Sequence, residues 1–330
     1  MRKSCGTTQQ VRAMYEKYPY PAPLAGDNLI FDLANVVGFT FPEEDFAGKT
    51  IIDYGCGTGH RLVGLAQRFP DAKVIGIDIS AASIAVAQKL ADANQVENIS
   101  FFEHDILEYR HPDGADLITS TGVIHHLENP QAGFSSISGN LREEGFALIW
   151  LYHSIGEYFR LLDRDLVKLL STAGEGEYED GINTIRELNL ALPEEKYGTN
   201  TAYPSNRQIG RTSIDVDAYL HPIVRAYRFE EAAELFHRAG LNWCCINSVN
   251  REGESKLLDP CEKSDEPYFC LQPAGILGSP RLVERFRTLP LRQKLQVIEI
   301  AWRPTGFTCI GGKGQSFRRC EERVVAGILI

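Results

Sequence analysis

A short apolar run that ends in three alternating glycines constrains this chain more than any other feature. Residues 51–60 read Ile-Ile-Asp-Tyr-Gly-Cys-Gly-Thr-Gly-His, which predicts a buried strand, a tight turn and the start of a helix. Glycines permit backbone angles that other residues avoid, and they let a ligand approach the main-chain N–H groups at a helix start. The segment therefore predicts a site for a nucleotide-like ligand at the end of the strand.

Around this segment, short apolar runs alternate with helix-like segments as far as Tyr152. The expected strands are Thr50–Asp53, Lys73–Asp78, Ile99–His104, Asp116–Ser120 and Phe146–Tyr152. Helices with apolar residues at helical spacing are expected at His60–Phe69, Ser80–Asn94 and Gln131–Leu141. Strands that alternate with helices predict an α/β fold, in which helices cover a parallel sheet.

The spacing of the glycines discriminates between nucleotide-like ligands. A dinucleotide fingerprint requires G-x-G-x-x-G, whereas here His60 stands in the place of the third glycine and the pattern is G-x-G-x-G. Asp78 ends the second strand about twenty residues later, where its carboxylate can accept both hydroxyls of a ribose. A dinucleotide-dependent oxidoreductase shares the strand, the turn and the acidic residue, so it remains an alternative.

These residues resemble motif I and the following motifs of the class I S-adenosylmethionine-dependent methyltransferases. The resemblance implies S-adenosylmethionine as the cofactor, with the glycine loop around its methionine and ribose. It also implies that Asp105 hydrogen-bonds the adenine amino group and that Ile106 packs on the ring. The implied cofactor residues in this part of the chain are Asp53, Gly55, Cys56, Gly57, Gly59, Asp78, Ile79, Asp105 and Ile106.

The fourth expected strand runs into Thr-Gly-Val-Ile-His-His-Leu at residues 121–127. This segment resembles the G-x-x-H-H-L sequence of the ubiquinone-biosynthesis-like, small-molecule branch of the family. The resemblance implies that Thr121 and Gly122 border the methionine part of the cofactor through their backbone.

Four residues at the carboxyl edge of the sheet are candidates for a general base, because ligands of open α/β sheets bind at that edge. They are His125, His126, Tyr152 and His153. Imidazole titrates near neutral pH and suits the role. The sulfonium methyl is itself a reactive electrophile, so the transfer can also proceed without a base. In that case the histidine pair holds its loop by hydrogen bonds.

Residues 1–47, which precede the core in the sequence, are expected to form an arm or lid. Pro19, Pro21 and Pro23 forbid a continuous helix over residues 14–24 and favour an extended cover. The segment YEKYPYP resembles an arm that closes over the cofactor in some bacterial methyltransferases. Tyr15 and Tyr20 are therefore candidate contacts to the donor, although aromatic side chains here can equally serve packing.

The remaining chain extends the same fold. Residues 48–152 form the expected cofactor-binding core, and residues 153–226 interrupt the alternation with helical pieces that are expected to bind the acceptor. Residues 227–330 complete the core sheet and carry a C-terminal extension, with a helix at Phe229–Ala239, a strand at Leu241–Val249 and a last strand near Phe307–Ile310. The resemblance implies a Rossmann-like, doubly wound, mostly parallel sheet of seven strands.

Composition and charge limit the kinds of ligand and partner that we expect for this chain. The formal net charge of −10 argues against a surface that tracks nucleic-acid phosphates. The chain has neither a run of about 18 apolar residues nor an apolar secretory leader, so we expect a cytoplasmic protein. The eight scattered cysteines predict neither a disulfide framework nor a metal site. We expect a small organic methyl acceptor. A protein or RNA acceptor and a non-catalytic S-adenosylmethionine-binding protein remain alternatives, and the oligomeric state is open.

Overall fold

The computed structural model describes residues 6–21, 32–41, 44–172, 178–190, 212–251, 253–262, 269–314 and 316. Its chain divides into two compact units, each assembled from separate segments. The first unit comprises Met1–Tyr109, His126–Asn129 and Tyr158–Val224. The second unit comprises Arg110–His125, Pro130–Glu157 and Arg225–Ile330.

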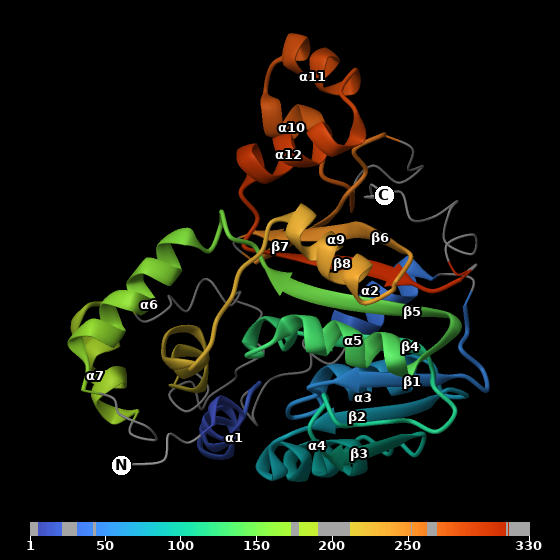
Figure 1. The fold of residues 1–330 in the computed structure, drawn as a ribbon, viewed down its shortest axis with the longest axis vertical. Coiled ribbons are helices and arrows are strands. Elements are labelled where there is room, and N and C mark those ends of the chain that lie inside the picture. The colour runs from blue at the N-terminus through green and yellow to red at the C-terminus, as the bar shows by residue number, and fades with distance from the viewer. Residues whose placement is uncertain are drawn as a thin grey trace. The chain divides into compact units, whose positions relative to one another are not determined.

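The first unit contains the start of the predicted α/β core (Figure 1). Its strands are β1 (Thr50–Tyr54), β2 (Lys73–Asp78) and β3 (Ile99–Glu103), which pair in parallel in the order β3-β2-β1. The helices between them are α3 (His60–Arg68) and α4 (Ala81–Ala93). Every residue of β1 is buried, as its apolar sequence predicts. Ser80 caps α4, because its hydroxyl accepts the Ser83 N–H at 3.1 Å.

The same unit contains the helices of the arm and of the insertion. They are α1 (Thr7–Lys17), α2 (Asp32–Thr40), α6 (Tyr158–Leu170), α7 (Glu179–Glu187) and the π-helical segment η4 (Val216–Leu220). Met14 of α1, Val167 of α6, Ile185 of α7 and Val216 of η4 belong to one buried cluster, and each has no exposed surface. The arm and the insertion therefore share an apolar core.

The arm differs from the extended cover that the prolines predict. Residues 7–17 form a helix, and the backbone leaves it at Tyr18, directly before Pro19. Val11, Met14, Tyr15 and Tyr18 follow one another at helical spacing and supply an apolar stripe. The prolines thus end a helix that lies before them, and Pro23 falls outside the described residues.

The second unit contains the remaining strands, in the order β4-β5-β8-β6-β7. The strands are β4 (Ala115–Thr121), β5 (Leu141–Tyr152), β6 (Trp243–Arg251), β7 (Glu254–Leu257) and β8 (Gly306–Gly312). Strands β4 and β5 are parallel, whereas β8 is antiparallel to both β5 and β6, and β7 is antiparallel to β6. The predicted Rossmann-like fold is confirmed.

Two helices in this part of the chain, Pro130–Asn140 and Phe229–Arg238, lie where the sequence predicts them. The helices of this part are η2 (Ile124–His126), α5 (Pro130–Asn140), α9 (Phe229–Arg238), α10 (Pro273–Leu277), α11 (Pro280–Arg287) and α12 (Leu291–Trp302). The last three form the group of orange and red helices in Figure 1. Across the described ranges, the helices are too short or too polar to cross a bilayer.

Among the residues that the structure describes there are eight strands, one more than the seven expected. The additional strand, β7, turns back on β6 across Gly253, whose φ is 81°. Two of its four residues are exposed and two are half-buried, so it lacks the apolar alternation that predicts a strand.

Candidate functional site

The glycine-rich turn after β1 is fixed to the end of β2. The N–H groups of Gly55 and Cys56 donate to the Ile77 carbonyl at 2.7 and 3.0 Å. Gly59 begins α3 with a φ of 78°, and a Cβ atom there would lie 2.6 Å from the Ala87 Cβ. Only glycine fits such a position, which lets α3 and α4 approach each other beside the loop.

Asp78 stands at the end of β2 and is 9% exposed. Its Oδ2 accepts the Gly57 N–H at 2.8 Å and its Oδ1 accepts the Ser80 N–H at 2.9 Å. Burial raises the pKa of Asp78 above its usual value, although these hydrogen bonds act in the opposite direction. A carboxylate has about four lone-pair positions, so each oxygen can also accept a ribose hydroxyl. The loop and Asp78 fit the sugar of a nucleoside cofactor.

Two further motif residues are buried beside the loop. Asp53 lies on β1 with 4% exposure, and Cys56 lies in the loop with 7%. Burial and the carboxylates of Asp78 and Asp53 raise the pKa of the Cys56 thiol. The thiol therefore stays protonated and unreactive at neutral pH.

Asp105 and Ile106 follow β3. Asp105 Oδ1 accepts the Leu107 N–H at 2.8 Å, and its carbonyl accepts the N–H groups of Glu108 and Tyr109. Ile106 is buried. Asp105 thus shapes the turn after β3, and its second carboxylate oxygen remains an acceptor for a base amino group.

The N-terminal arm contacts the same edge of the unit. The Tyr20 carbonyl accepts the Thr58 N–H at 3.3 Å, and the Pro21 carbonyl accepts the Thr58 hydroxyl at 2.8 Å. Arg12 of α1 pairs with Glu103 at the end of β3. The Ala82 N–H, in the first turn of α4, donates to Glu16 at 3.4 Å. The arm therefore reaches the glycine loop, α4 and β3.

His126 is 6% exposed and lies among residues of the insertion. Its Nδ1 lies 2.7 Å from the Ile223 carbonyl, and its ring stacks on that of His221 at 3.7 Å between centroids. A carbonyl can only accept, so Nδ1 carries the proton and Nε2 is the basic nitrogen of the neutral ring. Burial lowers the pKa of His126, which keeps the ring neutral near pH 7.

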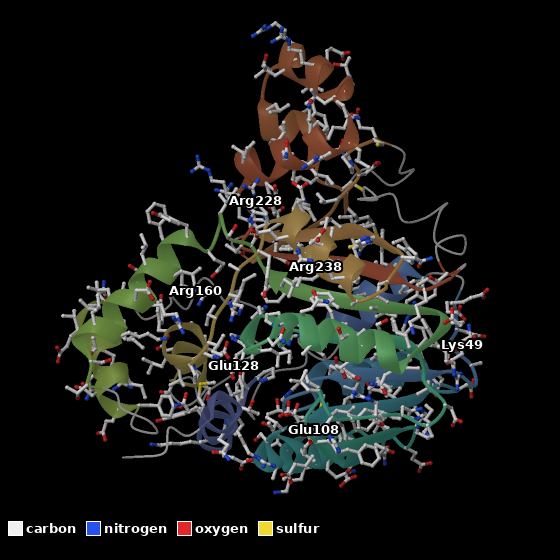
Figure 2. All side chains as sticks on the ribbon, viewed as in Figure 1. Lys49, Glu108, Glu128, Arg160, Arg228 and Arg238 are labelled. Atoms are coloured by element: carbon white, nitrogen blue, oxygen red, sulfur yellow. The ribbon has the colours of Figure 1, made fainter. Side chains whose placement is uncertain are left out.

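Two arginines of α6 hold the segment beside His126. Arg160, labelled in Figure 2, donates to the Ala218 carbonyl at 2.5 Å. Arg164, which is 7% exposed, donates to the His221 carbonyl at 2.5 Å. Carbonyls at the end of a helical segment lack intrahelical partners and attract cations. The arginines therefore stabilise η4 and the turn that follows it.

The second unit contains the other predicted site residues near the end of β4 and β5. His125 is fully buried, and its ring centroid lies 4.2 Å from that of Tyr152. Gly122 has a φ of 78°, and a Cβ atom there would meet nothing within 4 Å. Thr121 precedes it as the last residue of β4 and is half-buried.

His153 is fully buried, and both of its ring nitrogens have hydrogen-bond partners. Nε2 lies 2.9 Å from Glu299 Oε1, and Nδ1 accepts the Ile155 N–H at 3.2 Å. The ring also makes edge-on contacts with the rings of Phe229 and Phe307, at centroid distances of 5.1 and 5.5 Å. A histidine with these partners holds the end of β5 in place, so it is unsuited to take a proton from an acceptor.

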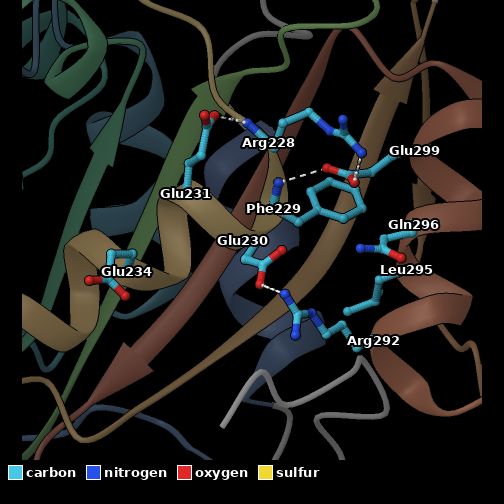
Figure 3. A pocket seen from close by; sticks show the side chains of 9 residues that line it. All are labelled: Arg228, Phe229, Glu230, Glu231, Glu234, Arg292, Leu295, Gln296 and Glu299. Carbon is cyan, nitrogen blue, oxygen red and sulfur yellow. Dashed lines mark hydrogen bonds and ion pairs between the residues drawn. The ribbon is translucent and has the colours of Figure 1, made fainter.

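A cavity of about 440 Å³ lies between α9 and α12 in the second unit (Figure 3). The charged groups around it are paired: Arg292 with Glu230, and Arg228 with the buried Glu299. The predicted site residues are absent from its lining. The cavity is thus separate from the residues that carry the motifs.

The sequence did not single out Asp217 and His221 beside His126. Both are buried, with exposures of 8% and 0%. A possible signal lies in residues 214–221, Ile-Asp-Val-Asp-Ala-Tyr-Leu-His, where acidic residues and a histidine interrupt an apolar run. In the described part of the chain, no group of three or more His, Cys, Asp or Glu side chains could hold a metal ion.

The comparison with known families agrees with this geometry. Residues 45–174 match the model of a methyltransferase domain. An uncharacterised protein of Synechococcus sp. is 27% identical over 314 residues, which span 89% of this chain and 68% of that protein. Trans-aconitate 2-methyltransferase of Deinococcus radiodurans is 36% identical over 104 residues, 32% of this chain and 37% of that enzyme.

Ajmaline N-methyltransferase of Rauvolfia serpentina is 35% identical over 94 residues, 28% of this chain and 32% of that enzyme. The match thus spans about a third of each of these two enzymes. The fold is similar to that of PKMT2 from Rickettsia typhi, which was solved with AdoHcy. The TM-score is 0.52 at 14% identity, over 90% of this chain and 55% of that one. The chain contains a class I S-adenosylmethionine-dependent methyltransferase domain, with S-adenosylmethionine as its cofactor.

Proposed function

We propose that the protein transfers the methyl group of S-adenosylmethionine to a small organic molecule. The observation that carries this proposal is the fixed arrangement of the glycine loop and the buried Asp78 carboxylate. The names of the similar enzymes support the kind of acceptor, since trans-aconitate and ajmaline are both small molecules. Their matches are partial, so the acceptor of this chain is a proposal in its own right.

The residues of the first unit divide the work of binding the cofactor. The glycine loop, with Gly57 and Gly59, would hold the methionine and ribose portion against the start of α3. Asp78 would accept the ribose hydroxyls. Asp105 and Ile106 would contact the adenine. These roles are those of the predicted motifs, and we extend them to Asp53, Gly55, Cys56 and Ile79 around the loop.

When bound, S-adenosylmethionine supplies a methyl group on a positively charged sulfur. That methyl group would pass to the lone pair of an acceptor atom held in line with the carbon–sulfur bond, and the electron pair of the broken bond would stay on sulfur. In the neutral ring of His126, Nδ1 carries the proton and donates it to the Ile223 carbonyl. Nε2 is therefore the nitrogen that can take a proton from a methyl acceptor that carries one. We therefore choose His126 as the base.

The other candidates receive smaller roles. His125 and Tyr152 pack their rings against each other within the second unit, and His153 is left out because of its two partners. Tyr20 would cover the cofactor through the arm. The branch of the family suggested by G-x-x-H-H-L and a cytoplasmic location belong to this proposal as well.

An acceptor screen tests the proposal. Purified protein and radiolabelled S-adenosylmethionine are incubated with panels of small carboxylic acids, amines and phenols, and labelled product is measured together with S-adenosylhomocysteine. We expect stoichiometric formation of both with at least one compound, and loss of both in Asp78→Asn. Transfer to proteins alone would contradict a small acceptor. Cofactor binding without transfer to any compound or protein would favour a non-catalytic protein.

A further inference from the structure

The helix α1 contacts two parts of the first unit through different sides. Arg12 and Glu16 face the cofactor edge, where they pair with Glu103 and with the N–H of Ala82. Met14 is fully buried in the cluster that α1 shares with α6, α7 and η4, and Tyr15 packs against the same cluster. A single rigid helix thus connects the ends of the cofactor-binding strands with the insertion.

Tyr15 provides the polar contact on the second side. Its hydroxyl donates to Asp217 Oδ1 at 2.8 Å, and its ring centroid lies 5.8 Å from that of His221. Asp217 is 8% exposed, and a buried carboxylate needs partners to stay charged. Tyr15 is such a partner, and it comes from an element about 200 residues away in the chain.

The charged groups that act on His126 have opposite effects. Arg160 and Arg164 of α6 disfavour the imidazolium, and so does burial, whereas the carboxylate of Asp217 favours it. His221 stacks on the ring, and Tyr15 reaches the same group of residues through Asp217. Asp217 is therefore a negative group that acts on His126. Without the Asp217 carboxylate, the positive charge of a protonated His126 would be repelled by Arg160 and Arg164.

The backbone places Asp217 for this task. It is the second residue of the π-helical turn η4, and Arg160 and Arg164 hold the carbonyls at and after the end of that turn. Single π-helical turns are frequent at functional sites, because the extra residue redirects a side chain.

We propose that Tyr15 and Asp217 are positioning residues for His126: Tyr15 holds the Asp217 carboxylate, and that carboxylate stabilises the imidazolium formed when His126 takes a proton. The packing of α1 against the insertion thereby determines the basicity of His126. This inference rests on the proposed function, in which His126 accepts the proton of the methyl acceptor.

The test measures the ionisation of His126 directly and needs no acceptor. Protein labelled with ¹⁵N in its histidines is titrated by NMR, and the His126 signals are assigned by their loss in His126→Asn. Asp217→Asn keeps an oxygen for the Tyr15 hydroxyl but removes the charge, so the midpoint of His126 should fall by about one pH unit. Tyr15→Phe should lower it less, and Asp217→Glu should restore it in part.

Asp92→Asn is the matched control, because Asp92 is an exposed carboxylate of α4 in the same unit. Its midpoint for His126 should equal that of the unmodified protein. An unchanged midpoint in Asp217→Asn, with or without a lower melting temperature, would overturn the inference and leave the pair a structural role. Failure of the proposed function would appear separately, as absent cofactor binding or methyl transfer.

Discussion

Asp78 is buried and both of its carboxylate oxygens have fixed hydrogen-bond partners, and its proposed role in cofactor binding rests on this arrangement. We predict that Asp78→Asn weakens S-adenosylmethionine binding by roughly tenfold or more, because the amide loses the charge and points a donor at an N–H group. Calorimetric titration measures the change. Asp92→Asn, on the surface of α4, should bind as the unmodified protein does, and equal affinity in the two variants would contradict the role of Asp78.

Gly57 allows the closest approach between the loop and the arm. Its φ is 54°, and a Cβ atom would lie 2.3 Å from the Tyr20 carbonyl oxygen. We predict that Gly57→Val lowers the affinity for S-adenosylmethionine by roughly tenfold or more, since the side chain strains the loop and displaces the arm. Gly139→Ala is the control, because Gly139 lies on α5 with open space around it. Full binding by a folded Gly57→Val would refute the prediction.

His126 also makes the stability of the protein depend on pH. Burial lowers its pKa from the usual value of 6.5. Below about pH 6.5, His126 therefore binds a proton more readily in the unfolded chain than in the folded protein. Stability then falls as the pH falls through this window. We predict that His126→Asn loses less stability than the unmodified protein between about pH 7 and pH 5 in denaturant unfolding. An unchanged slope in His126→Asn would contradict the prediction.

Strands and helices of the core were predictable because each residue pattern there serves a single purpose. β1 is apolar on both faces and buried throughout, and α4 begins at a serine that caps it. The helix α1 was missed because the prolines that follow it favour an extended backbone. Its apolar stripe packs on an insertion far away in the sequence, so no local pattern indicates its partner. β7 was missed because exposed side chains leave no pattern.

The candidate site likewise has parts that the sequence predicts and parts that it does not. Glycine spacing and acidic strand ends identify a cofactor loop, since those residues act within one local segment. The surroundings of His126 depend on Asp217 and His221, about 90 residues further along, and no local spacing connects them. Likewise, nothing near His153 in the sequence indicates that Glu299 engages its ring.

Glu299 joins three elements of the second unit. Its carboxylate, 2% exposed, accepts from His153 at the end of β5, from Arg228 before α9 and from the Phe229 N–H at 2.7 Å. Burial opposes its ionisation, but the hydrogen bonds prevail and place its pKa below the usual 4.5. This contribution to stability is present above about pH 4.5 and is lost as the pH falls through the folded-state pKa.

We predict that Glu299→Gln lowers the free energy of unfolding at pH 7 by about 2 to 4 kcal/mol, because it leaves Arg228 and His153 without the buried carboxylate. Urea unfolding at several pH values measures it. The difference from the unmodified protein should shrink in acid, below about pH 4.5. Exposed Glu234→Gln should change stability by less than about 1 kcal/mol. A loss of the same size in both variants would argue against a special role for Glu299.

At the scale of the whole molecule, the methyltransferase match at residues 45–174 covers the motifs, and the segments on either side supply the individual character of this chain. The arm and the insertion pack together in the first unit, where α1 meets both the cofactor edge and the surroundings of His126. The C-terminal helices instead belong to the second unit, where Glu299 of α12 joins the end of β5 to the start of α9. We predict that acceptor choice depends on the arm and insertion, so that replacing residues there changes the acceptor without removing the cofactor site.

The most direct test is a calorimetric titration of the purified chain with S-adenosylmethionine and with S-adenosylhomocysteine, with NAD⁺ as the control ligand. We predict micromolar binding of the first two ligands, at one site per chain, and no measurable binding of the dinucleotide. Binding of NAD⁺ in their place, or no binding of either sulfur ligand by the folded protein, would contradict the assignment of the glycine loop and Asp78 to S-adenosylmethionine.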